Sequence, residues 1–286
     1  MGIFDRFKNE DKSPERKSPE RKPDFKPDTT GELKDFHPYE TGLAQAVQAL
    51  SDELRGKGIP ESRPCSREQF IALLAGISAL RRTPGIPGPS QDCPDYFTTL
   101  PRCAAPEAEA ECRAHLEKVF GITDRQSLLE FCRKEICCHS QYLDFVGFWE
   151  NRPPFDMAEL NEDAAGFFQA ARNFSAQFYP IVGHKGYLAW DICECVGHLR
   201  TGYACGILDR GELDELAKHW IVQARAFENW ADFAVSLVCG ELYWDFRHGS
   251  KLPELNKGLE LWTRLVRILM EEGTAWGSGM WYEPAE

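Results

Sequence analysis

The sequence lacks any apolar stretch long enough to cross a membrane, since a spanning helix needs about 20 consecutive apolar residues. The nearest stretch, FIALLAGISAL at residues 70–80, is closed off by Arg81 and Arg82. The first residues, MGIFDRFKNEDK, also lack the apolar run of a secretory signal, and Arg6 stands where a myristoylation motif needs Ser or Thr. We therefore expect a cytoplasmic protein without a transmembrane segment.

Positive charge is scarce. The chain has 33 Lys and Arg residues against 45 Asp and Glu residues, which gives a formal net charge of -12. This balance opposes nonspecific attraction to the phosphate backbone of nucleic acids, whose binding depends on Lys and Arg. We expect no nucleic-acid partner.

Several motifs of catalysis and phosphate binding are missing from the sequence. It contains no G-x-x-x-x-G-K-S/T phosphate loop, no G-x-G-x-x-G motif and no G-x-S-x-G nucleophile elbow. The 11 cysteines are irregularly spaced and include no C-x-x-C pair, so we expect them to be mostly reduced, with no structural zinc. Cys132 and Cys239 fall where small apolar residues would lie on helices. We expect no cofactor.

Helical periodicity dominates the rest of the chain. From residue 39 onward, apolar residues recur every three or four positions, and no run alternates with period two. This pattern predicts an all-α protein with a bundle-like domain of many helices. The Pro- and Gly-rich stretch 83–106 is a long connection. We therefore expect a small helical part with its Pro-rich loop at 39–106 and the main Trp-rich helical domain at 107–286.

The remaining N-terminal residues, 1–38, contain the tandem SPERKSPERK and hardly any apolar side chains. Such a segment cannot offset the entropy of ordering, so we expect a disordered charged tether. Ile3, Phe4 and Phe7 lie at helical spacing within it, which leaves open a weak peripheral contact with a membrane.

Four helix starts carry a local signal. A capping residue is followed three positions later by Glu or Gln at Ser66, Thr123, Asp156 and Asp209. The capping side chain and the Glu or Gln each satisfy a backbone N–H group of the first turn. We expect a helix to begin at each of these four positions.

Two Trp-containing segments carry a family resemblance. The runs AWDICECVGHLRTGYACGILD (189–209) and NWADFAVSLVCGELYW (229–244) resemble the bacterial family called domain of unknown function 1266, over roughly residues 115–250. The residues that match its pattern are Trp190, Asp191, Arg200, Gly202, Tyr203, Trp230, Gly240 and Trp244. The resemblance implies an all-helical fold and a bacterial origin, and it implies no particular reaction.

This chain departs from the family pattern at three positions. Glu194 and Glu241 stand where the pattern leads us to expect arginines, and Thr201 stands where we expect tryptophan. If the family has a basic pocket for anions, these two charge reversals put such a pocket in doubt for this member.

The helix expected around residues 188–204 has a polar stripe formed by Asp191, Glu194 and His198. One interpretation is a solvent-facing side with a weak Glu194–His198 pair. The alternative is a carboxylate and histidine site between two helices, as in a metal-dependent hydrolase, because a second stripe shares one face of a later helix. The residues of this second stripe are Glu241, Asp245 and His248. The familiar Glu-x-x-His spacing is absent from both.

Asp191 and Arg200 point to opposite sides of one helix, so each needs a partner on another helix or a ligand. Arg200 beside Tyr203 would suit a carboxylate or phosphate. Trp190, Trp230 and Trp244 are expected in the core, whereas Trp276 and Trp281, in a Gly-rich tail, are candidate anchors for a partner. Our leading hypothesis is a binding module without catalysis, whose partner is another protein and whose cleft is lined by Asp191, Arg200 and Tyr203. The other candidate binding residues are Trp190, Trp230 and Trp244.

Overall fold

The computed structural model describes residues 42–58, 60–88 and 95–282, and the predicted tether at 1–38 with Ile3, Phe4 and Phe7 lies outside them. The all-α prediction is confirmed: within the described residues, the regular secondary structure is helical apart from two strands of two residues each. The α-helices are α2 (Leu43–Gly56), α3 (Arg67–Leu74), α4 (Gly76–Leu80), α5 (Pro106–Phe120), α6 (Arg125–Glu135), α7 (Cys138–Trp149), α8 (Glu162–Ala176), α9 (Tyr179–Val182), α10 (Leu188–Ala204), α11 (Arg210–Ala224), α12 (Trp230–Arg247) and α13 (Leu252–Leu269). The short 3-10 helices are η3 (Met157–Glu159), η4 (Gly183–Lys185) and η5 (Trp276–Ser278), and the strands are β1 (Arg63–Pro64) and β2 (Met280–Trp281).

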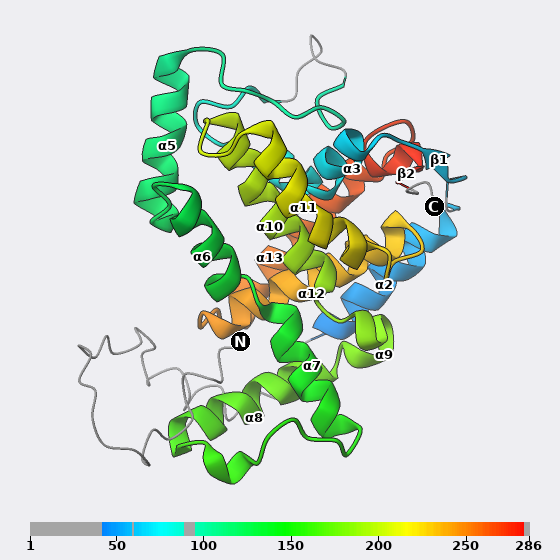
Figure 1. Cartoon of the computed structure of the whole chain (residues 1–286). Helices are drawn as coiled ribbons and strands as arrows, with labels where there is room; N and C mark the ends of the chain where they lie inside the picture. The colour runs from blue at the N-terminus through cyan, green and yellow to red at the C-terminus, as the bar shows by residue number, and fades with distance from the viewer. Residues whose placement is uncertain (1–41, 59, 89–94, 283–286) are drawn as a thin grey trace, which may run out of the picture.

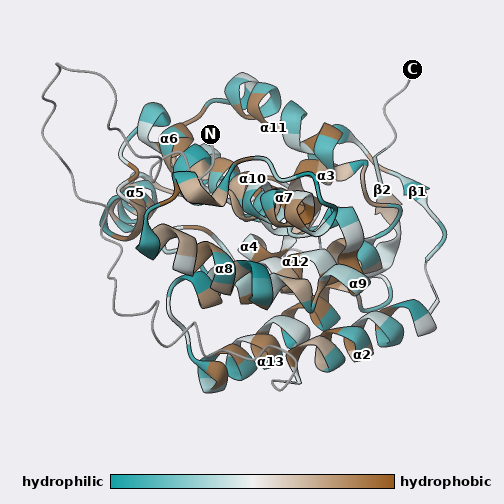
Figure 2. Cartoon of the chain, turned by 90° about the horizontal axis from the view of Figure 1, so that it is seen from below, coloured by the Kyte–Doolittle hydropathy of each residue, from teal (hydrophilic) through white to brown (hydrophobic). Residues whose placement is uncertain are grey.

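The helices lie in layers around α10 and α12. Helices α2 and α13 lie side by side, α12 packs on both, α10 packs on α12, and α11 packs on α10 (Figures 1 and 2). Helices α6 and α7 close the remaining side of α10, and α3 and α4 pack against it as well. The segments before residue 83 therefore share one hydrophobic core with the Trp-rich segments.

The structure corrects the expectation that α10 has a solvent-facing side. Asp191 is 6% exposed and His198 is 9% exposed, and nearly every other residue of α10 is buried as well. The physical reason is that other helices cover the polar stripe, which the periodicity of one helix cannot reveal. α10 is thus a buried helix whose polar groups must find partners within the protein.

Two of the four predicted helix starts are confirmed as capping boxes, at Ser66 before α3 and at Asp209 before α11. The third is shifted by one residue, because Asp124 rather than Thr123 caps α6 and pairs reciprocally with Ser127. The fourth is wrong for a long helix: Asp156 caps only the 3-10 turn η3, and α8 begins after a second cap, Asn161.

The C-terminal tail folds back on the body, and Trp276, one of its two candidate anchors, is not exposed. Trp276 is completely buried, stacks on Trp230 with ring centroids 5.2 Å apart, and donates its indole N–H to the Leu73 carbonyl at 2.9 Å. Trp281 is half-buried against Trp230 at 4.7 Å. The parallel pairing of β1 with β2 holds the tail beside the connection that precedes α3.

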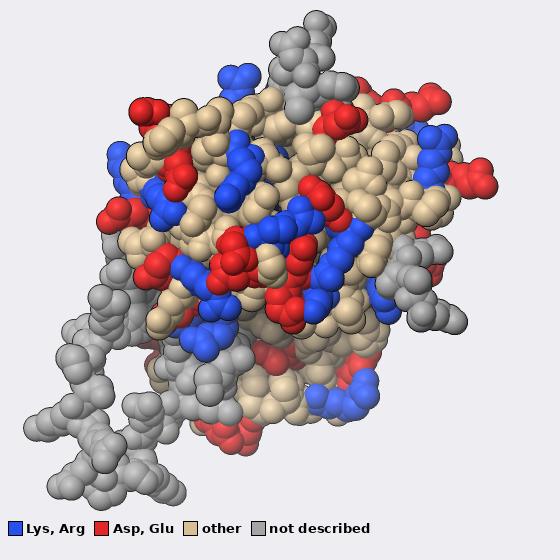
Figure 3. All heavy atoms as spheres, turned by 45° about the horizontal axis from the view of Figure 1, so that its top comes forward, with Lys and Arg blue, Asp and Glu red and all other residues tan. Residues whose placement is uncertain are grey.

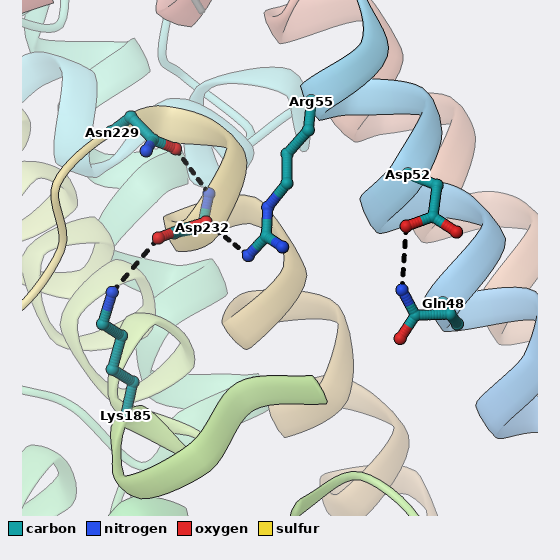
Figure 4. A network of polar contacts seen from close by, with 6 residues as sticks. All are labelled: Gln48, Asp52, Arg55, Lys185, Asn229 and Asp232. Carbon is teal, nitrogen blue, oxygen red and sulfur yellow. Dashed lines mark hydrogen bonds and ion pairs between the residues drawn. The ribbon is translucent and has the colours of Figure 1, made fainter. Parts of the chain in front are cut away.

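An ionic network joins α2 to the central helices. Asp232 of α12 accepts hydrogen bonds from Arg55 at 2.9 Å and from Lys185 at 3.1 Å, while the Asn229 side chain caps its helix by accepting from the Asp232 N–H (Figure 4). Asp232 has only 14% of its side chain exposed, so both cations help to offset its desolvation. The network fixes the position of α2 against the end of α12.

Surface charge of both signs is interspersed over the face shown in Figure 3. Such a mixed face offers no continuous basic track of the kind that follows a phosphate backbone. Within the described residues, no helix combines the length and the apolar character that crossing a membrane requires.

Candidate functional site

A cavity of about 230 Å³ lies where α10 and α12 meet the end of α4 and the helices α5 and α6. We call it the Arg81 pocket and define it by six of its lining residues. These are Arg81, Trp190, Glu194, His198, Glu241 and Trp244. Five of them are residues that the sequence singled out, and three of these five, Glu194, His198 and Glu241, belong to the two stripes described above.

Arg81 is the residue that the sequence analysis missed. Its guanidinium Nη1 lies 2.8 Å and 3.0 Å from the two carboxylate oxygens of Glu194, and Nη2 lies 3.6 Å from Glu241 Oε2. The same group stacks over the Trp262 ring, 4.5 Å from its centroid. Two acids in place of expected arginines were a signal that an arginine had to come from elsewhere in the chain.

Glu241 is the more buried of the two acids, with 7% of the residue exposed. Its Oε2 accepts a hydrogen bond from the Trp190 indole N–H. Burial raises the pKa of Glu241 to about 8 against the attraction of Arg81, and the negative charge of Glu194 acts in the same direction as burial. At neutral pH the carboxyl group is therefore largely protonated while Arg81 is held mainly by Glu194.

His198 forms part of the apolar wall. Its ring contacts Phe120 and Phe131 edge-on, at centroid distances of 4.7 Å and 4.8 Å. Burial lowers the pKa of His198 to about 4, so the imidazole is neutral at physiological pH. A charged Glu194–His198 pair is therefore absent at neutral pH.

Aromatic side chains make up the rest of the pocket wall. Trp190 stacks on Trp244 with ring centroids 4.9 Å apart, and the Arg247 guanidinium lies 4.9 Å from the centroid of the Trp244 ring. The pocket thus combines the Arg81 guanidinium with two carboxyl groups, the neutral imidazole of His198 and large aromatic rings.

The other predicted binding residues contact different parts of the molecule. Asp191 accepts the His139 backbone N–H at 3.2 Å and so caps α7, whose own N-cap residue Cys137 makes no capping bond. Tyr203 lies under the Arg102 guanidinium at 4.6 Å. Trp230 belongs to the tail cluster and donates to the Met280 carbonyl.

Arg200 is 2% exposed and lies over the Tyr96 ring, 5.3 Å from its centroid. Within the described part of the chain, its Nε and Nη2 atoms have no hydrogen-bond partner. As the sequence indicated, it does not pair with Asp191. It does not line the Arg81 pocket.

The six residues of the alternative metal site are not gathered around one point. Asp191 caps α7, His198 packs between phenylalanines, and the His248 Nδ1 lies 2.7 Å from the Trp244 carbonyl. Within residues 42–58, 60–88 and 95–282, no three His, Cys, Asp or Glu residues are grouped so that they could hold a metal ion. These placements give the metal-dependent hydrolase no support.

A family model described as "Protein of unknown function (DUF1266)" matches residues 115–278, which is more than half of the chain. The chain belongs to this family. No curated protein and no solved structure matches the chain. The expected match, 115–250, is confirmed and extends into the tail.

Within this member of the DUF1266 family, the pocket is built from two parts of the chain. Trp190, Glu194, Glu241 and Trp244 lie inside the matched segment, whereas Arg81 precedes it. Helix α4 and its following arginine therefore supply the positive charge that faces the two glutamates of the matched segment.

Raising the pH from about 6.5 to about 8 should lower the free energy of unfolding by about 2 kcal/mol. Glu241 has a pKa of about 8 and Asp191 of about 7 in the native state, both raised by burial, so the native protein keeps protons that the unfolded chain has lost. The effect is measured by urea unfolding at each pH.

The buried histidines act at lower pH and in the opposite direction. Burial lowers the pKa of His139 and His198 to about 4, whereas the unfolded chain binds these protons below about pH 6.5. The two histidines therefore make the free energy of unfolding rise between about pH 4 and pH 6.5, and they add no pH dependence above that range.

The variant Glu241→Gln is the control for the decline between pH 6.5 and pH 8, and it should lose most of that decline. A decline of equal size in this variant would contradict our assignment.

Proposed function

We propose that this protein is a binding module without catalysis, and that the Arg81 pocket receives the guanidinium or ammonium group of its ligand. One observation carries the proposal: the protein's own Arg81 guanidinium already lies against the two glutamates, 2.8 Å from Glu194 and 3.6 Å from Glu241. A site that holds this group in its own chain has the geometry to hold it in a ligand.

The surroundings favour a cation over an anion. The charge of Arg81 is already met by Glu194, so little positive charge remains to attract an anion. Trp190 and Trp244 line the pocket, and aromatic rings attract organic cations. A ligand cation would displace the Arg81 side chain, 39% of which is exposed, from the two glutamates.

The ligand group has two possible sources, a free small amine or guanidine and an arginine or lysine side chain of a partner protein. Both sources supply a delocalised or compact cation that would bind between the Glu194 carboxylate and the Glu241 carboxyl group. Our expectation of a protein partner favours the second source, and the experiment below distinguishes the two.

Removing the internal guanidinium should open the site. We expect Arg81→Ala to bind butylguanidinium at least ~tenfold more tightly than the natural protein, as measured by titration calorimetry. Millimolar guanidinium chloride should also raise the melting temperature of Arg81→Ala, because a bound ligand stabilises the native state. This second readout tests the site even if the variant is less stable.

The matched control is Arg82→Ala, which removes the same charge from a residue that also lines the pocket but makes no ion pair with Glu194 or Glu241. It should bind no better than the natural protein. Adding Glu194→Gln to Arg81→Ala should abolish the gain. Equal binding by the Arg81 and Arg82 variants would refute the proposal.

The source of the cation is tested with a blocked tripeptide, Ala-Arg-Ala, beside free butylguanidinium. Tighter binding of the peptide would indicate an arginine side chain of a partner protein. Equal or tighter binding of the free cation would indicate a small molecule.

A further inference from the structure

A second cavity, of about 310 Å³, is lined by residues of α2, α9, η4 and α12. We call it the Lys185 cavity and define it by six of its lining residues. These are Arg55, Ile181, Val182, Lys185, Asp232 and Val235. Among the described residues, none lines both this cavity and the Arg81 pocket. Its volume lies at the lower end of the range that holds small ligands.

Two cations share one carboxylate at this cavity. Arg55 Nη2 lies 2.9 Å from Asp232 Oδ1, and Lys185 Nζ lies 3.1 Å from Asp232 Oδ2 (Figure 4). Asp232 is the one acidic residue among the described residues that line the cavity. Since a single carboxylate balances only one of the two cations, the cavity carries an excess of one positive charge.

The hydrogen-bonding capacity that remains in the cavity consists of N–H donors. A guanidinium has five N–H donors and an ammonium has three. Within the described part of the chain, Arg55 and Lys185 each use one side-chain donor, and both are used on Asp232. The two Asp232 oxygens are therefore occupied, and the Ser236 hydroxyl already donates to the Gly186 carbonyl at 2.8 Å. A ligand that satisfies the remaining donors must supply acceptors, and an anion supplies the strongest ones.

Solvent reaches the two cations, while the other side of the cavity is apolar. The Arg55 side chain is 52% exposed and the Lys185 side chain is 33% exposed, so a ligand can approach both. Helix α9 contributes Ile181 and Val182 to the wall, and α12 contributes Val235. A short apolar group attached to the anion would lose contact with water against these side chains.

We propose that the Lys185 cavity binds a small carboxylate that carries a short apolar group. One negative charge neutralises the excess positive charge, and the planar donor fork of an arginine suits a carboxylate. The second charge of a phosphate monoester would be repelled by the neighbouring Asp232 carboxylate. This inference does not depend on the function proposed above, because the two sites have different lining residues.

The test titrates the full chain with pentanoate at constant ionic strength, followed by calorimetry. We expect saturable binding of pentanoate. The uncharged analogue 1-pentanol should bind at least ~tenfold more weakly, because it cannot neutralise the excess charge. Acetate should bind at least ~fivefold more weakly, because it lacks the apolar group. The absence of saturable pentanoate binding, or equal binding of 1-pentanol, would overturn the proposal, as would tighter binding of butyl phosphate.

Variants locate the site within the chain. Arg55→Gln and Lys185→Gln should each weaken pentanoate binding at least ~tenfold, and having two variants from separate elements keeps the test valid if one of them folds poorly. The matched control is Arg267→Gln. Arg267 is 50% exposed and also forms an ion pair with an acid on α2, Glu53, but it does not line the cavity. It should bind pentanoate as the natural protein does. Equal weakening by all three substitutions would refute the site, because it would reflect the overall charge.

Discussion

Replacing Trp276 with alanine should lower the free energy of unfolding by about 4 kcal/mol, the range found when a large aromatic side chain is removed from a core. Trp276 is completely buried, stacks on Trp230 and donates to the Leu73 carbonyl. The variant loses the buried ring area and leaves the carbonyl of α3 without this donor. Urea unfolding followed by circular dichroism measures the change.

The control for this prediction is Trp220→Ala on α11, a half-buried tryptophan at the edge of the core. Its loss should cost about 1 kcal/mol, which is ordinary for a partly exposed residue. Equal losses for the two variants would show that the tail is not packed as described.

Gly240→Ala should destabilise the protein by about 3 kcal/mol, at the upper end of what overpacking costs. A Cβ atom at this position in α12 would lie 2.3 Å from Trp190 Cβ and 3.2 Å from Tyr187 Cβ on the facing segment. Helices α10 and α12 would have to separate, because the hydrogen bond from the Trp190 indole N–H to Glu241 prevents Trp190 from moving aside. Urea unfolding again provides the measurement.

Gly56→Ala is the matched control, since a Cβ atom on this glycine of α2 meets nothing within 4 Å. Alanine is favoured over glycine in a helix by about 1 kcal/mol, so this variant should be slightly more stable than the natural protein. Opposite signs at the two positions would separate steric crowding from helix propensity. The same sign at both would mean that α10 and α12 are not in close contact at Gly240.

The features that could be predicted from the sequence are those that depend on local patterns of residues. The helical periodicity indicated α10 and α12, and the caps at Ser66 and Asp209 are local bonds between residues three apart. Glu194 and Glu241, one from each polar stripe, both line one cavity. These features follow from residues close in the chain or from one helix face.

The features that could not be predicted depend on distant segments. The helical periodicity shows on which face of α10 Asp191 lies, but it does not show that the N-terminus of α7 covers this side chain. Arg81 is 113 residues from Glu194, so no spacing rule links them. The Gly-rich tail has no periodicity to reveal that Trp276 enters the core.

The enclosure of α10 by other helices also constrains where insertions and deletions can occur in this chain. Because α3, α4, α6, α7, α11 and α12 all contact it, shortening any one of them would let water reach the centre of the molecule. Insertions and deletions are therefore tolerated best in the connections, where the backbone already faces solvent. The lengths of the surrounding helices are consequently interdependent, and a deletion within one would require compensating growth in a neighbour.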